Sequence, residues 1–210
     1  MTDEITLAIS KGRVLHEALP LLAQLGIVPL EDPEQSRRLI LATSQANVRL
    51  VLVRGADVPT YVEQGTAELG ITGKDVLLEH EGDGLYEPLD LGIARCRLVL
   101  AGPTPSLATP GRMRIATKYV RTARAYFADR GEQVQIIRLY GSMEIAPGLG
   151  LADGIVDLVD SGKTLAANNL VVLQTIMEIS SRLIVNKAAM KMKGAIIRPF
   201  IRRLAEVVCK

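Results

Sequence analysis

The sequence predicts an α/β protein in which a second α/β unit is inserted into the first. Short apolar runs of strand length alternate with segments whose apolar residues recur at helical spacing, and the alternation begins again after a proline-rich stretch in the middle of the chain. Strands separated by helices of this length favour a largely parallel sheet. Functional loops are therefore expected at the carboxyl ends of strands.

The first part of the chain supplies the elements of the first unit. Its segments of strand length are residues 5–10, 38–42, 48–53 and 69–72. Its segments with helical spacing are residues 13–25, 57–64 and a helix that begins in 73–78. Gly26 and Gly65 end the first two helices, and Asp57 followed by Pro59 is typical of a helix N-terminus. Residues 79–84 are polar and glycine-rich, which predicts a surface loop.

The middle of the chain repeats the pattern. Its expected strands are residues 97–101, 114–117, 134–139 and 154–159, and its expected helices are residues 119–129 and a short one near 142–146. Residues 103–111 hold three prolines and predict a loop. The last segment, 186–208, is helix-like, with Asn186 as its N-cap and with Gly194 and Pro199 as positions that should kink or divide it.

Composition excludes several classes of protein. Hydrophobic residues make up 48% of the 210 residues and charged residues 23%, as in globular proteins. A net charge of +2, five Tyr, two Phe and no Trp argue against nucleic-acid binding. Cys96 and Cys209 lie far apart without metal-ligand spacing, which favours reduced thiols. The acidic N-terminus and the lack of an apolar run approaching ~20 residues predict a soluble, cytoplasmic protein that has no membrane contact.

One strand-to-helix junction carries a candidate binding site. The apolar run 155–159 contains Asp157, and Ser161, Gly162 and Thr164 follow it with backbone N–H groups and hydroxyls that can hold an anion at a helix N-terminus. The Asp157 carboxylate can accept hydrogen bonds from sugar hydroxyls. Together these groups are suited to a phosphorylated ribose.

Two other interpretations of this junction exist. The letters Gly-Lys-Thr at 162–164 suggest a nucleotide-triphosphate P-loop, but that motif needs a first glycine where this chain has Asp157. An ordinary strand-turn-helix junction, with Asp160 or Ser161 as the N-cap, is the alternative without a ligand.

A longer pattern surrounds the junction. It consists of Glu144, Gly150-Leu151-Ala152, Ile155-Val156-Asp157-Leu158 and Ser161-Gly162-Lys163-Thr164-Leu165. This segment closely resembles the signature of the ATP phosphoribosyltransferases, the first enzymes of histidine biosynthesis. The opening strand with Lys11-Gly12-Arg13 and the segments 54–62 and 70–75 also resemble that family, so the likeness covers essentially the whole chain.

The resemblance implies an activity and a fold. The phosphoribosyl group would pass from phosphoribosyl pyrophosphate to N1 of the adenine of ATP, with release of pyrophosphate. The fold would comprise two α/β domains like those of type II periplasmic binding proteins, with the active-site cleft between them. Residues 1–92 and 180–210 would form the first domain, and residues 93–179 the second, which carries the phosphoribosyl-binding loop.

The resemblance also implies partners. The chain looks like the short form of the family, which lacks a histidine-binding regulatory domain. That form works with a catalytically inactive subunit resembling histidyl-tRNA synthetase. A homodimer of this chain within a hetero-oligomer is therefore expected.

The resemblance assigns roles to residues of this chain. Lys11, Arg13 and Arg37 are expected to act in catalysis by facing the pyrophosphate leaving group. Glu144 and Asp157 are expected to bind the ribose hydroxyls and to stabilise positive charge on the ring. The 5′-phosphate is expected against the backbone of Asp160, Ser161, Gly162, Lys163 and Thr164, with the Asp160 side chain turned away from it. The residues expected near ATP are Arg54, Gly73, Lys74 and Asp75.

The expected reaction needs Mg²⁺ but no general base. Mg²⁺ would be held mainly by substrate phosphates and water, without a dedicated protein site. Adenine N1 attacks with a free lone pair and loses no proton, so His16 and His80 are expected to be structural or solvated.

Two further functions compete with this one. A solute-binding module can share the same two-domain fold, but such proteins normally carry an export signal or a DNA-binding domain, neither of which is expected here. A phosphoribosyltransferase that acts on a free base usually has two adjacent acids after an apolar run, whereas this chain has single acids at positions 157 and 160.

Overall fold

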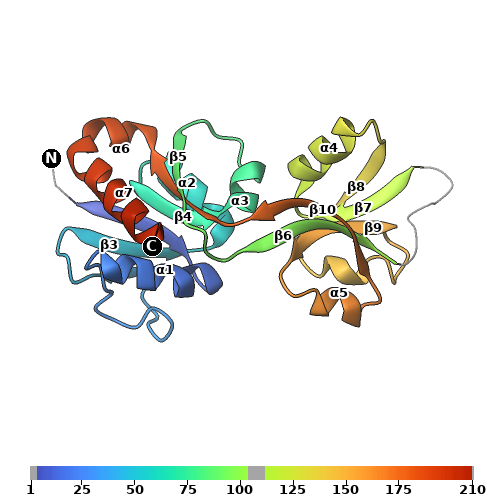
Figure 1. Cartoon of the computed structure of the whole chain (residues 1–210), viewed down its shortest axis with the longest axis horizontal. Coiled ribbons are helices and arrows are strands. Elements are labelled where there is room, and N and C mark those ends of the chain that lie inside the picture. Colours follow the sequence, from blue (N-terminus) through green and yellow to red (C-terminus); the bar gives the residue numbers. More distant parts are fainter. Residues whose placement is uncertain (1–3, 104–111, 210) are drawn as a thin grey trace. The chain divides into compact units, whose positions relative to one another are not determined.

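The computed structural model describes residues 4–103 and 112–209, and the chain divides into two compact units (Figure 1). One unit comprises Met1–Ala94 and Ser180–Lys210, and the other comprises Arg95–Ile179. The second unit is thus an uninterrupted stretch of chain, whereas the first is built from both ends. Each unit has its own sheet and its own hydrophobic core.

The discontinuous unit is built on a six-stranded sheet with the order β2-β3-β1-β4-β11-β5. Its strands are β1 (Ile5–Ser10), β2 (Ile40–Ala42), β3 (Val48–Val53), β4 (Leu69–Gly73), β5 (Leu85–Asp90) and β11 (Ser181–Asn186). Its helices are α1 (Arg13–Gln24), α2 (Val58–Glu63), α3 (Lys74–Glu79), α6 (Lys187–Met192) and α7 (Gly194–Val208), with a 3-10 turn η1 (Gly55–Asp57).

Strand β1 shows why this sheet is buried on both faces. All six of its residues are buried, although side chains alternate between the two faces of a strand. Its odd-numbered residues belong to the core formed with α1 and α7, while Ala8 belongs to the core formed with α2. A central strand covered by helices on both faces is therefore mostly apolar, and in β1 only Thr6 and Ser10 are polar.

The continuous unit is built on a five-stranded sheet with the order β10-β6-β9-β7-β8. Its strands are β6 (Cys96–Gly102), β7 (Met113–Thr117), β8 (Val134–Arg138), β9 (Gly154–Val159) and β10 (Val171–Ile179). Its helices are α4 (Val120–Asp129) and α5 (Lys163–Ala167), with a 3-10 turn η2 (Met143–Ile145). Helix α4 covers one face of the sheet through Phe127, and η2 and α5 cover the other through Met143 and Leu165.

The expectation of a largely parallel sheet is wrong, because both sheets are mixed. Strands β1, β3 and β4 pair in parallel, as do β7, β8 and β9, but β2, β5, β6, β10 and β11 all form antiparallel pairs. Three of the strands, β5, β10 and β11, were not expected from the sequence. β5 contains a proline and two acids, and β10 has exposed residues along most of its length, so neither shows a buried apolar run.

Most of the expected helices and turns are confirmed. The Asn186 side chain caps α6 by accepting a hydrogen bond of 2.7 Å from the Ala189 N–H. The C-terminal helical segment divides at Gly194, while α7 continues past Pro199 to Val208. The junction helix α5 begins at Lys163 with Gly162 as its N-cap residue, so neither Asp160 nor Ser161 has that role. Part of the expected proline-rich loop, residues 104–111, lies outside the described residues.

An ion pair fixes the loop between η2 and β9. Asp153 Oδ1 accepts a hydrogen bond of 2.8 Å from Arg114 Nη2, and Asp153 Oδ2 accepts one of 2.8 Å from the Arg114 backbone N–H. Arg114 Nη1 also donates to the Gly150 carbonyl at 2.9 Å. These side-chain and backbone hydrogen bonds from Arg114 hold the pKa of Asp153 below its ordinary value. The pair therefore ties strand β7 to the loop.

Asp153→Asn is expected to lower the free energy of unfolding at neutral pH by about 1–2 kcal/mol, since it removes a charge-assisted pair. Because the pKa of Asp153 is lowered in the folded state, its ionised form stabilises the protein above the unfolded pKa of about 3.9. That stabilisation is lost as the pH falls through the folded pKa, so the two proteins should converge in acid. Urea unfolding at pH 7 and below pH 4 measures both effects.

The matched control is Glu31→Gln, which breaks the exposed Arg38–Glu31 pair of 2.7 Å. Exposed ion pairs contribute about 0–1 kcal/mol, so this variant should change stability little. An equal loss in both variants would show that the Arg114–Asp153 pair has no special role.

Candidate functional site

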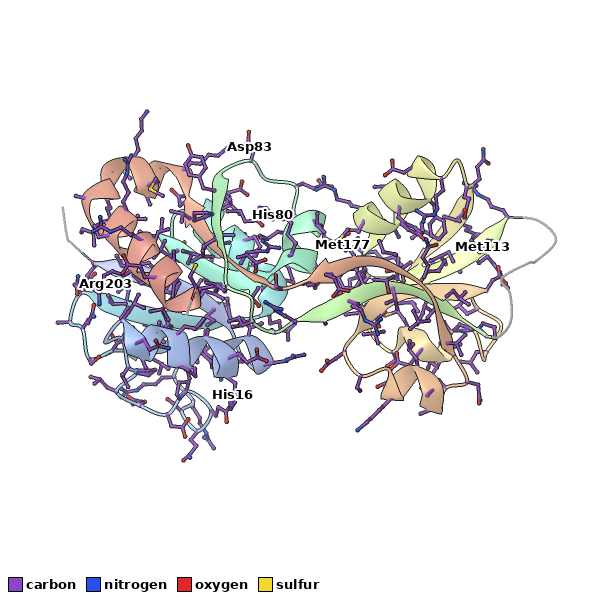
Figure 2. All side chains as sticks on the ribbon, in the orientation of Figure 1. His16, His80, Asp83, Met113, Met177 and Arg203 are labelled. Atoms are coloured by element: carbon purple, nitrogen blue, oxygen red, sulfur yellow. The ribbon has the colours of Figure 1, made fainter. Side chains whose placement is uncertain are left out.

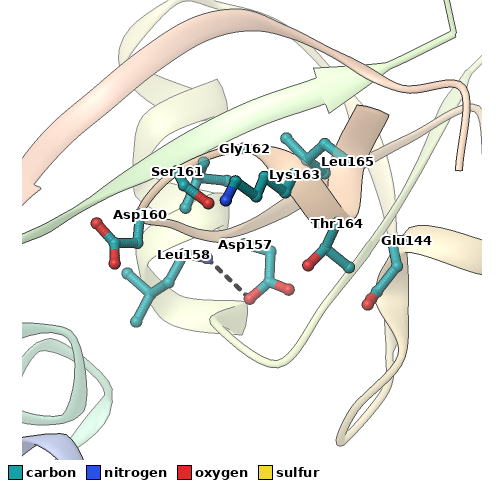
Figure 3. Close-up of a pocket in the computed structure, with 10 residues that line it drawn as sticks. Glu144, Asp157, Leu158, Asp160, Ser161, Gly162, Lys163, Thr164 and Leu165 are labelled. Atoms are coloured by element: carbon teal, nitrogen blue, oxygen red, sulfur yellow. Dashed lines mark hydrogen bonds between the residues drawn. The ribbon is translucent and has the colours of Figure 1, made fainter. Parts of the chain in front are cut away.

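A cavity of about 280 Å³ lies at the carboxyl end of β9 in the continuous unit (Figure 3). It is lined by Glu144 and by every residue from Asp157 to Leu165. The cavity thus joins the end of a strand, the turn after it and the first residues of α5. It also brings Glu144 to the same place from a distant part of the sequence.

The turn that forms the cavity is determined by a few residues. Val159 and Leu165 are buried and anchor the turn at its two ends, while Asp160, Ser161 and Thr164 are exposed. Gly162 has a φ of +76°, in the left-handed region that favours glycine, and its carbonyl accepts the Ala166 N–H at 3.1 Å. The first N–H groups of α5 have no partner within the helix, so they can bind an anion.

Strand alternation explains why Asp157 faces the cavity. Ile155 and Val159 belong to the core under η2 and α5, and Asp157 lies between them on the same face of β9. Asp157 is half-buried, and its Oδ1 accepts a hydrogen bond of 2.8 Å from the Leu158 N–H (Figure 3). This bond fixes the orientation of the carboxylate.

Glu144 lies across the cavity from Asp160 (Figure 3). It belongs to η2, which is held in place by the buried side chains of Met143 and Ala146. The Asp160 carboxylate points away from Glu144 and Thr164 (Figure 3). The cavity therefore combines three acids, Glu144, Asp157 and Asp160, with an N–H-rich turn.

Thr117, to which the sequence assigned no role, supports this site through a hydrogen bond to β9. It is fully buried at the end of β7; its hydroxyl donates to the Val156 carbonyl at 2.6 Å and accepts the Tyr119 N–H at 2.9 Å. The carbonyl that it binds directly precedes Asp157. Thr117 is thus a positioning residue for the end of β9.

On the expectation that the phosphoribosyl donor binds at Asp157, Thr117→Val should raise the KM for that donor about tenfold, because the end of β9 loses its lateral hydrogen bond and Asp157 shifts. Valine has the same shape but leaves the Val156 carbonyl and the Tyr119 N–H without this partner. Thr117→Ser keeps the hydroxyl and should restore the KM. Steady-state kinetics with the donor varied provides the measurement; a KM unchanged in Thr117→Val would contradict the positioning role.

A second cavity, of about 570 Å³, lies in the discontinuous unit and contains Lys11 and Arg54. These residues follow β1 and β3, which are neighbours in parallel register, with Ser10 opposite Val53. Asp57 and Tyr61, one turn apart on the segment after Arg54, also line it. The sequence reasoning missed Tyr61, although its spacing from Asp57 places the two on one helix face.

Arg13 and Arg37 line neither of these two cavities. Arg13 is exposed at the start of α1, and its Nε donates to Glu17 at 2.7 Å. The Ala94 N–H and Arg13 both donate to Glu17, and together they hold its pKa below the ordinary value. Arg37 is exposed in the segment between α1 and β2.

The segment Gly73-Lys74-Asp75 also lies outside both cavities. Lys74 Nζ forms an ion pair of 2.6 Å with Glu87. Asp75 is buried, and its carboxylate lies against Gly73, so a side chain at position 73 would collide with it. Gly73 is thus required by the local packing of Asp75.

The two histidines differ in their surroundings (Figure 2). His16 is exposed on α1, whereas His80 Nε2 lies 2.9 Å from Glu63 Oε2 after α3. Glu63 also accepts the Gly84 N–H at 2.9 Å. His80 therefore takes part in closing the loop that precedes β5.

Two features are absent from the described residues. No group of three or more His, Cys, Asp or Glu in residues 4–103 and 112–209 could hold a metal ion. In the same part of the chain, no helix is both long and apolar enough to cross a membrane.

Comparisons with known proteins agree on one family. The family model "HisG: ATP phosphoribosyltransferase" matches residues 54–206. The ATP phosphoribosyltransferase of Methylococcus capsulatus is 62% identical over 204 residues, which cover 97% of this chain and 96% of that protein. The one from Nitrosococcus oceani is 59% identical over 210 residues, which cover 100% and 99%.

Solved structures give the same result. The chain resembles one described as the ATP phosphoribosyl transferase (HisG:HisZ) complex from Thermotoga maritima, with a TM-score of 0.83, 35% identity and coverage of 97% of this chain and 98% of that one. The periplasmic aliphatic sulphonate binding protein SsuA from Escherichia coli matches with a TM-score of 0.63 at 13% identity, covering 98% and 72%. The second match concerns the fold alone, and it confirms the expected likeness to periplasmic binding proteins.

Proposed function

The chain belongs to the ATP phosphoribosyltransferase family and catalyses the first step of histidine biosynthesis, and we propose that it binds the phosphoribosyl donor in the cavity formed by Glu144 and residues 157–165. One observation carries the proposal: the fold gathers the acids Glu144 and Asp157 and an N–H-rich turn around one cavity of about 280 Å³. Donors of this kind present a sugar with hydroxyls and a phosphate within a few ångströms, and the lining matches both.

Each group in the cavity then has a task. The backbone N–H groups at the start of α5 and the hydroxyls of Ser161 and Thr164 bind the 5′-phosphate. Lys163, which also lines the cavity, adds a positive charge there. Asp157 and Glu144 accept hydrogen bonds from the ribose hydroxyls. Their negative charges also stabilise the positive charge that builds on the ring as the bond to pyrophosphate breaks.

The attacking group needs no help from a base. Adenine N1 carries a free lone pair, so it attacks the anomeric carbon without first losing a proton. The leaving pyrophosphate gains negative charge and needs cations. We assign Lys11, Arg13 and Arg37 to this task and Arg54, Gly73, Lys74 and Asp75 to ATP, because of the family resemblance of the segments that carry them. Single alanine variants of Lys11 and Arg13 should lower kcat more than donor affinity.

We propose Mg²⁺ as the cofactor. Substrate phosphates and water would supply most of its ligands, because Mg²⁺ binds phosphate oxygens and keeps several waters. When bound, Mg²⁺ neutralises charge on the phosphates. Removing it with EDTA is expected to abolish turnover, and adding Mg²⁺ back should restore it. Pyrophosphate release that continues unchanged in EDTA would contradict this assignment.

We also propose a regulatory partner. The similar Thermotoga structure is a HisG:HisZ complex, and it matches this chain over 98% of its own length. A subunit that resembles histidyl-tRNA synthetase should therefore bind a homodimer of this chain in the cytoplasm, where ATP is available. Light scattering of complexes purified from the native host would show a mass well above that of a homodimer. A homodimer alone under those conditions would count against the partner.

The donor site can be tested apart from turnover. Phosphoribosyl pyrophosphate should slow amide hydrogen exchange in residues 157–165 of the pure chain, and the effect should disappear in Asp157→Ala. A parallel assay with ATP and Mg²⁺ should yield pyrophosphate and phosphoribosyl-ATP. Turnover without protection of residues 157–165 would move the donor to another site while leaving the family assignment intact.

A further inference from the structure

The C-terminal helical segment is unusually basic for a chain with a net charge of +2. Residues 187–203 contain no acidic residue. Their basic residues are Lys187, Lys191, Lys193, Arg198, Arg202 and Arg203. The remainder of the chain is therefore net acidic, and this one segment, which forms α6 and most of α7, accounts for the positive sign. Such a concentration of charge raises the local anion concentration.

Three of these cations surround a cavity of about 450 Å³. Its lining consists of Tyr86, Lys187, Ala188, Met190, Lys191 and Arg198. No acidic residue belongs to the lining. Glu87, the nearest acid on β5, neighbours Tyr86 in sequence and therefore faces the other side of the strand, where it pairs with Lys74.

The cations of this segment differ in what they contact. Lys193 pairs with Glu68 at 2.6 Å, and Arg203 donates to the Leu25 carbonyl at 2.9 Å. The side chains of Lys191 and Arg198, by contrast, form no hydrogen bond or ion pair with any residue in 4–103 or 112–209. The segment therefore leaves its unpaired charge at the cavity.

Tyr86 and Lys187 complete the cavity wall. Tyr86 is 49% exposed, and Lys187 Nζ lies 5.6 Å from the centroid of its ring. This cation–π contact orients the ammonium group without neutralising its charge. The ring, with Ala188 and Met190, adds an apolar surface beside the three positive groups.

We propose that this cavity binds a small phosphate-bearing anion. Three cations without an acid match a ligand that carries several negative charges, and the guanidinium fork of Arg198 suits phosphate oxygens. The volume lies in the range of small-ligand sites, whereas a flat protein interface requires no such concavity. The inference does not depend on the proposed donor site, which lies in the other unit.

The test uses inorganic tripolyphosphate as the probe, added to the isotope-labelled full chain without Mg²⁺ and followed by NMR. The amides of Tyr86, Lys187, Lys191 and Arg198 should shift in a saturable way. Shifts at residues 157–164 report the donor cavity in the same spectra, so the two sites are measured separately. Lys191→Gln and Arg198→Gln should each weaken binding at the basic cavity about three- to tenfold.

Arg202→Gln provides the matched control. Arg202 is exposed one turn along α7 and does not line the cavity, so the variant changes the net charge by the same amount. It should leave the affinity nearly unchanged. Equal weakening in Arg202→Gln would show a general electrostatic attraction and overturn the proposal.

Two other outcomes would also overturn it. One is the absence of shifts at the basic cavity when the donor cavity is saturated. In the other, Lys191→Gln or Arg198→Gln no longer binds the regulatory subunit, while tripolyphosphate causes no shift in the parent chain. That result would assign these cations to a protein interface.

Discussion

Asp157→Asn is expected to lower kcat/KM for the donor about a hundred- to a thousandfold, the scale observed when one charge-stabilising group is removed from an active site. Asparagine keeps the size of the side chain and one carbonyl oxygen. It can still accept the Leu158 N–H bond of 2.8 Å, so the end of β9 should keep its structure. What is lost is the negative charge, which we propose faces the ribose ring of the bound donor. The measurement is steady-state turnover with ATP saturating and the donor varied.

The control for this variant is Asp129→Asn. Asp129 is an exposed acid at the end of α4 in the same unit, and it lies outside the cavity. The Asp129→Asn variant should retain full activity and an unchanged melting temperature. If Asp157→Asn also kept full activity, the donor would have to bind elsewhere, and the roles assigned to Glu144 and residues 157–165 would be wrong.

Gly70→Ala is expected to destabilise the protein by about 1–3 kcal/mol, which is the typical cost of overpacking a core. A Cβ at this position in β4 would lie 2.7 Å from Val62 Cγ2, 2.8 Å from Val58 Cγ1 and 3.0 Å from Ile184 Cγ1. Val58, Val62 and Ile184 are all fully buried, so none can move into solvent. The close approach of α2 to the sheet therefore requires glycine here.

Thermal unfolding measures this effect. For a chain of this length, each kcal/mol shifts the melting temperature by about 2–4 °C. Gly141→Ala is the matched control, because a Cβ at Gly141 meets no atom within 4 Å. It should leave the melting temperature nearly unchanged. A Gly70→Ala protein as stable as the parent would mean that α2 moves away from β4 without cost.

The cavity at the end of β9 could be predicted from sequence because most of it is local. Asp157 and the turn to Thr164 are consecutive, and the end of a strand followed by a glycine turn and a helix fixes their arrangement. Glu144 is different. Nothing in its spacing places Glu144 opposite Asp160. From the sequence, only the family resemblance joins it to the site.

The side-chain contacts of the other predicted site residues are harder to predict from sequence. Arg13 and Lys74 follow strands just as expected, yet their side chains form ion pairs with Glu17 and Glu87. Glu87 lies on β5, which was not expected from the sequence. Glu17 lies four residues after Arg13 on one helix, a spacing that permits their ion pair but does not require it. The roles of Arg13 and Lys74 in binding substrate therefore stay predictions for kinetics to test.

The fold was predictable where strands are buried and not where they are exposed. β1 has six buried residues and a mostly apolar sequence, and its existence and bounds are confirmed. β10 has mostly exposed or half-buried residues, and Pro88 interrupts the sequence of β5, which lies at the edge of its sheet. β11 is apolar and buried, but it directly follows β10, and the two merge into one unassigned stretch of sequence.

The position of β11 has a consequence for biogenesis. This strand lies between β4 and β5 and contributes the fully buried Leu183, Ile184 and Val185, yet it is translated only after residues 95–179. On the ribosome, the inserted unit emerges whole and can fold at once, while the first 94 residues wait with an open sheet between β4 and β5. The N-terminal part of the nascent chain should therefore be the one that chaperones hold, until the final helices complete it.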